Sequence, residues 1–532
     1  IKKKSRVENC FHNVLCLSKA KGMDIKMKKT NIVFKFSKKE ITRLLCLIIS
    51  GVSVIIGYSI KNFNVLCTSM IFLLIHNIIY VFENTKDRVI FLILHITIFT
   101  FLISRPFIGM LRGEKWWLES GQAPENIYFS INVILLSMLF IYIGAVIGEH
   151  IYQKVERNND NNQEKNQKKI QFRNNLQVVS MLAFYITMCF FLVQEGEKLL
   201  YMQGRSYVEY YAGFHSQLPG IFYTIASFMK YSLCVFLATF PSKKRAFTPL
   251  FLFELSAIPE LLIGVRNPIM LNSIFIFLYY IMRDIYEKRQ KWIGKIEKVI
   301  LVISIPTSLI FMTVYAYVRS GVAIAQKNIF KLFFDFFYGQ GVTFNVLSIA
   351  YGYRNNLPER PWRNYTFGGM IDYIVHGRIG QMLFGTDPLP EGNNWTNGTL
   401  SNNFSHNFSY LVRKDDYLNG QGWGSSYILE TYVDFGYIGL ILFNLILGIL
   451  LVYMLKRLGR NTLLDTIFLL SLTTIFLIPR AEATGWLSFI VTAQFWACIL
   501  ACYLGAYICM KCKWIQNILK ILHLYPKTDV EL

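Results

Sequence analysis

Long apolar blocks alternate with short polar segments along most of the chain. Each block is about as long as a helix that crosses roughly 30 Å of hydrocarbon, and no block contains more than two charged residues. The pattern therefore predicts an all-α polytopic membrane protein with about twelve transmembrane helices. The predicted spans are 41–60, 63–82, 89–104, 127–148, 176–193, 219–240, 247–264, 268–282, 299–318, 427–455, 462–478 and 486–510.

Basic residues indicate which side of the membrane each short connection faces. With a cytoplasmic N-terminus, the five short connections on that side (83–88, 149–175, 241–246, 283–298 and 456–461) carry 20 Lys or Arg residues. The five short connections on the opposite side carry eight. Because Lys and Arg are enriched in cytoplasmic connections, we expect both termini to be cytoplasmic and the protein to lie in the cytoplasmic membrane.

The spans divide the chain into five parts. These are a basic cytoplasmic segment (1–40), helices one to nine (41–318), a large external loop (319–426), helices ten to twelve (427–510) and a cytoplasmic tail (511–532). The first segment has no apolar core, so we do not expect it to be a cleaved signal peptide.

Composition excludes several classes of protein. Only 17% of the residues are charged, against about 25% in soluble domains, and 53% are hydrophobic. This balance argues against a water-soluble enzyme. The net charge of +22 follows mainly from the positive connections, which favour contact with anionic lipid headgroups. We therefore expect no nucleic-acid partner.

The external loop is unusually long for a mere connection. It carries Trp362, Tyr365, Trp395 and Trp423 among Asn, Gly and Ser residues. Flat aromatic faces beside amides and hydroxyls suit sugar rings, but the same aromatics also suit a lid at the level of the headgroups. Within the loop, residues 323–351 are too interrupted by charges and glycines to span, so they predict a helix lying in the interface.

Three single arginines stand at predicted external helix ends, where the positive-inside rule disfavours them. Arg266 lies between spans seven and eight, Arg319 ends span nine, and Arg480 lies between spans eleven and twelve. Each alone fits a snorkelling membrane anchor. Together around one cavity they would form a clamp for a diphosphate, because guanidinium groups bind phosphate oxygens in a bidentate manner.

Ionisable side chains inside predicted spans are functional suspects, and four of them match in depth two by two. Lys230 and Glu254 lie at similar depth, which predicts a structural ion pair, with a proton or ion path as the alternative. His76 and His95 also match in depth on adjacent spans, which predicts a hydrogen-bonded pair that joins two helices.

One motif carries a resemblance to a known family. The stretch His406–Gly439 ends in G-x-G-S-S-x-x-x-E-x-Y-x-x-F-G-x-x-G, and Gly264–Pro268 forms a G-x-R-x-P element. With the multi-span body and the long external loop, these resemble the Wzy-type O-antigen and capsular repeat-unit polymerases. The resemblance implies a GT-C-like membrane glycosyltransferase that joins undecaprenyl-diphosphate-linked oligosaccharides outside the cytoplasmic membrane.

The resemblance suggests roles for the candidate site residues. His406 and Glu430 are candidate general bases, Arg266, Arg319 and Arg480 would bind the substrate diphosphate, and Trp395, Trp423 and Tyr427 would contact sugar. Alternatively, Glu430 pairs with an arginine and only holds the clamp in place. Gly436 and Gly439 are expected to let helices approach closely.

We expect no metal and no other cofactor, since Asp415–Asp416 is the only adjacent acidic pair in the external loop. The expected partners are the undecaprenyl-diphosphate-linked oligosaccharide and the lipid bilayer, and the resemblance adds a chain-length regulator and a flippase as candidates. Two alternative functions stay open: an O-antigen ligase and a polysaccharide flippase or other transporter. The long external loop and the absence of two similar halves argue against transport.

Overall fold

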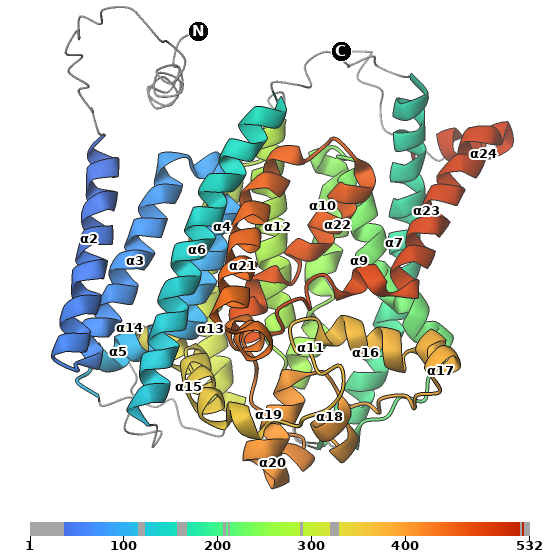
Figure 1. Ribbon diagram of the computed structural model, residues 1–532. Coiled ribbons are helices and arrows are strands. Elements are labelled where there is room, and N and C mark those ends of the chain that lie inside the picture. The colour runs from blue at the N-terminus through green and yellow to red at the C-terminus, as the bar shows by residue number, and fades with distance from the viewer. Residues whose placement is uncertain are drawn as a thin grey trace, which may run out of the picture. The chain divides into compact units, whose positions relative to one another are not determined.

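The computed structural model of the protein describes residues 37–114, 123–156, 167–205, 209–210, 213–287, 291–319, 329–521 and 524–525. In these ranges every regular element is a helix (Figure 1). The chain divides into two compact units, residues 1–41 and 42–532, and only the last five residues of the first unit are described.

Eleven helical segments of the described residues are long and apolar enough to cross a membrane. The protein is therefore an all-α polytopic membrane protein, as its sequence predicts. The segments are α2 (Lys38–Ser59), α3 (Phe63–Glu83), α4 to α5 (Thr85–Leu111), α6 (Pro124–Glu156), α7 (Gln167–Met202), α9 (Gly220–Ala238), α10 to α11 (Lys243–Ile263), α12 (Asn267–Tyr286), α21 (Tyr427–Arg457), α22 to the 3-10 helix η3 (Thr462–Arg480) and α23 (Ala493–Lys511).

Two predicted spans differ from this set. The predicted span 299–318 falls on α13 (Lys295–Arg319), a 25-residue helix whose side chains are described only in part and which is not among the eleven. The last predicted span begins too early at 486, since the helix α23 starts at Ala493. Residues 481–492 instead form irregular backbone and the short 3-10 helix η4 (Ser488–Val491), which leaves polar groups near the end of the bundle.

Helices α6 and α21 pack closely because glycines face backbone across their contact. A Cβ atom on Gly144 would lie 2.2 Å from the Leu445 carbonyl oxygen, and one on Gly448 would lie 2.1 Å from that of Ile141. Small residues allow such close approach between membrane helices. Our prediction that Gly436 and Gly439 serve this purpose is wrong. Gly436 has a φ of 64° and kinks α21, and Gly439 faces Phe435 of its own helix.

The segment after α13 folds into a layer of short helices at one end of the long ones, which we call the loop-side end (Figure 1). The sequence predicted one helix over 323–351, whereas the described residues of this region form two helices, α14 (Ile329–Gln340) and α15 (Thr343–Tyr353), which meet at Gly341. There the Arg105 backbone nitrogen lies only 2.5 Å from the position of a Cβ. The helices are α14 (Ile329–Gln340), α15 (Thr343–Tyr353), α16 (Gly368–His376), α17 (Arg378–Phe384), α18 (Trp395–Leu400), α19 (Phe404–Val412) and α20 (Lys414–Leu418).

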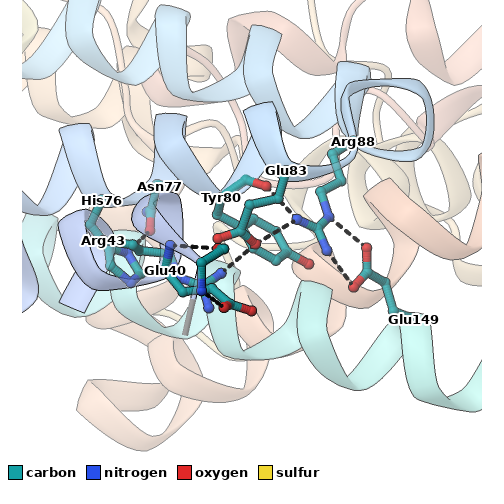
Figure 2. A network of polar contacts seen from close by, with 9 residues as sticks. Glu40, Arg43, His76, Asn77, Tyr80, Glu83, Arg88 and Glu149 are labelled. Atoms are coloured by element: carbon teal, nitrogen blue, oxygen red, sulfur yellow. Dashed lines mark hydrogen bonds and ion pairs between the residues drawn. The ribbon is translucent and has the colours of Figure 1, made fainter. Parts of the chain in front are cut away.

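A polar network ties α2, α3, α4 and α6 together at the opposite end (Figure 2). Arg88 Nε and Nη2 donate to the two carboxylate oxygens of Glu149 at 2.7 and 2.9 Å, and Arg43 donates to Glu83 at 2.9 Å. Arg88 also lies over the Tyr80 ring, with 3.6 Å from Cζ to the ring centroid. The planar fork of Arg88 thus holds three helices in register.

The predicted pairs inside the spans do not form directly. His76 and His95 are bridged by Asn77, whose Oδ1 lies 2.9 Å from His76 Nδ1 and whose Nδ2 lies 2.9 Å from His95 Nε2. Glu254 accepts a hydrogen bond from Ser273 at 2.6 Å, and it forms no ion pair with Lys230. Equal depth in the membrane was therefore not enough to predict these pairs, because depth does not determine which neighbour a side chain faces.

Candidate active site

A short loop between η3 (Ile475–Arg480) and η4 carries a cation and a carboxylate two residues apart, Arg480 and Glu482. Three hydrogen bonds fix the conformation of this loop. Ala483 N donates to Glu430 Oε2 at 2.7 Å, Thr484 Oγ1 donates to the Thr366 carbonyl at 2.6 Å, and Trp486 Nε1 donates to the Ala483 carbonyl at 2.9 Å. These bonds hold the backbone between Arg480 and Trp486 in one conformation.

Glu430 is the residue that fastens this loop to α21. Its side chain is fully buried in the first turn of the helix. One carboxylate oxygen accepts from Ala483 N, and the other accepts from Ser425 Oγ at 2.5 Å. The expected ion pair with Arg266 or Arg480 does not form among the described residues. Glu430 instead bonds to the backbone three residues after Arg480 and so helps to fix the position of that arginine.

Arg480 reaches from this loop toward α14. Its Nη1 donates to Gln340 Oε1 at 2.8 Å, and its guanidinium lies 5.8 Å from the centroid of the Phe101 ring. Phe101 belongs to the π-helical turn η1 (Phe99–Ile103), which interrupts the span formed by α4 and α5. Arg480 is thus held by a neutral amide and an aromatic ring.

Arg266 approaches Arg480 from the turn between α11 (Ile258–Ile263) and α12. Gly264 ends α11 in the left-handed conformation, with a φ of 111°, and Pro268 starts α12. Such a sharp stop and start explains the G-x-R-x-P element, since only glycine adopts this φ without strain. Arg266 donates to the Met312 carbonyl of α13 at 3.1 Å, and its positive charge acts on that of Arg480.

Of the three predicted arginines, Arg266 and Arg480 therefore lie near enough for their charges to interact. Arg319 is the last residue of α13, the helix that Arg266 contacts, but its side chain lies outside the described part of the chain. Two like charges that converge in a partly buried place repel each other, and such an arrangement favours an anion between them.

Two acidic residues belong to the site, Glu482 in the loop itself and Asp372 on α16. Asn403 Nδ2 donates to Glu482 Oε1 at 2.7 Å, while Asp372 of α16 accepts from Asn402 N and Nδ2 at 2.7 and 2.8 Å. Burial raises the pKa of both carboxyl groups, and the charge of Asp372 raises that of Glu482 further. Our sequence reasoning missed Glu482 and Asp372, and the only signal for Glu482 was its position two residues after Arg480.

His406 lies on α19, one turn from Asn403. Its Nδ1 lies 2.8 Å from the Tyr417 hydroxyl, and burial lowers its pKa, so the imidazole is neutral at pH 7. The amide of Asn403 bonds both to the backbone of His406 and to the side chain of Glu482. Its Oδ1 accepts from His406 N at 3.2 Å and its Nδ2 donates to Glu482.

The three predicted sugar contacts lie in different surroundings. Trp395 is 59% exposed, whereas Trp423 is partly covered by Phe408, with 5.6 Å between the ring centroids. Tyr427 is fully buried and its hydroxyl donates to Asn444 at 2.9 Å, so it presents no face to a ligand. Trp362 is 88% exposed at a φ of 64°, an unusual conformation for an aromatic residue.

No group of three or more His, Cys, Asp or Glu side chains suited to a metal ion occurs in the described ranges. The family described as O-antigen polysaccharide polymerase Wzy matches residues 42–513, which includes every site residue above. No curated protein and no solved structure matches the chain, so the likeness to GT-C enzymes stays a prediction. The family match covers most of the chain, and the protein therefore belongs to the O-antigen polysaccharide polymerase Wzy family.

Proposed function

We propose that the protein joins undecaprenyl-diphosphate-linked oligosaccharide repeat units into an O-antigen-like or capsular polysaccharide. The reaction takes place at the outer face of the cytoplasmic membrane, which is where the loop-side end lies. The acceptor hydroxyl of one lipid-linked unit attacks the anomeric carbon of the growing chain, and undecaprenyl diphosphate leaves.

This proposal rests on Arg266 and Arg480, whose positive charges interact. Negative charge develops on the diphosphate oxygen as the glycosidic bond to it breaks, and fixed donors that meet this charge lower the barrier. Arg480 has no carboxylate partner among the described residues, and its one hydrogen-bond acceptor is the neutral amide of Gln340. Its charge is thus available to a phosphate. Arg319 completes the clamp.

The position of helix α14 is an argument for a lipid-linked substrate. Gln340, its last residue, contacts Arg480, while Phe334 and Lys331 line a cavity of about 350 Å³ together with Ile108, Leu111 and Arg112. Phe334 and Gln340 lie about 9 Å apart along the helix at 1.5 Å per residue. One helix therefore connects this cavity, which is lined by both apolar and basic side chains, to Arg480, and such a path suits a prenyl chain beside its diphosphate.

The remaining residues receive positioning and recognition roles. Glu430 holds the Arg480 loop, and His406, whose backbone bonds to Asn403, orients the acceptor sugar. Exposed Trp395 and partly exposed Trp423 offer faces for sugar rings.

Reaction of the purified protein with a defined lipid-linked repeat unit tests the proposal. A ladder of products that grows by one repeat supports polymerisation. A single transfer to a different acceptor would favour a ligase, and movement of the lipid across a vesicle without new bonds would favour a flippase.

Labelling with a membrane-impermeant thiol reagent tests the placement of the loop-side end. In a variant whose exposed Cys189 and Cys512 are replaced by Ser, Glu391→Cys should react in intact cells. Lys244→Cys, on the first turn of α10, should react only after permeabilisation. Reaction in the reverse order would place the arginines at the cytoplasmic face and overturn the proposed location.

A further inference from the structure

Glu482 has one carboxylate oxygen engaged and one open. Asn403 holds Oε1 at 2.7 Å, whereas Oε2 has no hydrogen-bond partner among the described residues. Glycines flank this second oxygen. A Cβ atom on Gly369 would lie 3.2 Å from Oε2, and one on Gly485 would lie 3.4 Å from it. Because neither residue has a side chain, the positions that their Cβ atoms would take beside Oε2 are unfilled.

The open oxygen lies beside the charge that the proposed reaction needs. Arg480 and Glu482 are joined by one residue, and the loop that carries them is fixed by Glu430, Thr366 and Trp486. A cation for the leaving diphosphate and a carboxylate for the attacking hydroxyl thus stand on one rigid loop. Holding both groups in place supplies much of the acceleration in a transfer between two bound substrates.

The other candidate bases are less suited to take a proton. Glu430 is fully buried, and both of its oxygens accept hydrogen bonds from the protein. His406 engages Nδ1 with Tyr417, and its backbone is tied to Asn403. Only Glu482 combines an open carboxylate oxygen with a place on the Arg480 loop.

We infer that Glu482 is the proton acceptor of the glycosyl transfer, an inference that rests on the proposed function. As the acceptor oxygen bonds to the anomeric carbon, its proton passes to Glu482 Oε2. The bond between that carbon and the diphosphate oxygen breaks, and its electron pair leaves with undecaprenyl diphosphate. Because burial and Asp372 raise the pKa of Glu482, its carboxylate is more basic than that of a surface glutamate.

Steady-state kinetics of the purified protein with a synthetic lipid-linked repeat unit test the inference. Glu482→Gln keeps an oxygen that accepts from Asn403 but removes the base, so kcat should fall about 100-fold or more while substrate binding and melting temperature stay unchanged. Glu391→Gln, an exposed acid in the same layer, is the matched control and should keep the wild-type rate. Added formate should restore part of the rate of Glu482→Ala.

The glycines give a second test that leaves the carboxylate in place. Gly369→Ala brings a methyl group against Oε2 and should lower kcat, whereas Gly485→Ala makes only ordinary contact and should lower it less. Wild-type kcat in Glu482→Gln would overturn the inference while leaving polymerisation intact. If Glu482→Gln does not fold, a wild-type kcat in Gly369→Ala and no formate rescue of Glu482→Ala would overturn it. Failure of the wild-type protein to form a ladder would overturn the proposed function itself.

Discussion

Glu430 Oε2 accepts a hydrogen bond from the backbone N–H of Ala483 at 2.7 Å, and this bond joins α21 to the loop that carries Arg480. The most conspicuous acid of the family motif thus contacts the backbone three residues after the arginine. A buried carboxylate that accepts from a backbone N–H forms a strong, short hydrogen bond. The motif around Glu430 accordingly positions the neighbouring loop, which carries Arg480, one of the arginines that we propose bind the diphosphate.

Glu430→Gln and Glu430→Ala should therefore behave differently. The glutamine oxygen still accepts from Ala483, so Glu430→Gln should retain elongation within about tenfold of wild type. Glu430→Ala leaves that N–H and the Ser425 hydroxyl without their acceptor, which costs about 1–3 kcal/mol for each buried group. We expect a lower melting temperature and little elongation. A Glu430→Gln protein with normal melting and no activity would instead identify Glu430 as the base.

The glycines between α6 and α21 should be essential for stability. Gly144→Ala places a methyl group 2.2 Å from the Leu445 carbonyl oxygen, so the helices must separate, at a cost of about 1–3 kcal/mol. Gly51→Ala in α2 is the control, because no atom lies within 4 Å of the added Cβ. Thermal unfolding in detergent measures both. Equal melting temperatures for the two variants would show that the contact is looser than described.

The Arg88–Glu149 pair should matter more when one partner is lost than when both are. The side chains are only 10% and 13% exposed, and removal of Arg88 leaves a buried carboxylate without its cation. Arg88→Met should lower stability by about 3–5 kcal/mol, and adding Glu149→Gln should recover part of it. If the double variant unfolds no later than the single one, the two residues do not stabilise the bundle as a pair.

The pH dependence of elongation should identify the base. Burial raises the pKa of Glu482 above 4.5, and as the pH falls through this raised value the carboxylate gains a proton and the rate drops. The charge of Asp372 acts in the same direction, since it disfavours a further negative charge on Glu482. The fall in kcat at low pH should be absent in Glu482→Gln but present in His406→Gln, whatever the overall rate of that variant. Absence of this fall in His406→Gln alone would assign it to the histidine.

The sequence predicted the spans well because lipid-facing helices must be apolar over a fixed length. It singled out Arg266 and Arg480 for a related reason, since single cations at helix ends stand out against apolar flanks, and their role in binding a diphosphate stays a prediction. Arg319 is a prediction of the same kind that its undescribed side chain leaves untested.

Other features depend on contacts that no local pattern encodes. The start of α23 at Ala493 follows from the folded loop before it, and the Lys230–Glu254 pair failed because depth along a helix does not fix its rotation. Glu482 is a single acid in a short loop. Only the fold shows that it meets Asn403, Gly369 and Asp372.

The initial rate of elongation of a lipid-linked repeat unit by the Arg→Lys variants tests the diphosphate clamp most directly. Lysine keeps the charge but loses the planar fork, so Arg266→Lys and Arg480→Lys should each lose about 2–4 kcal/mol of transition-state stabilisation, a 30- to 1000-fold lower rate. Arg319→Lys should behave in the same way. Arg205→Lys is the control, because Arg205 is exposed and, among its described contacts, its side chain bonds only to Tyr201 near the end of the preceding helix α7. Wild-type rates in all four variants, with normal expression and insertion, would show that the arginines are membrane anchors and that no clamp exists.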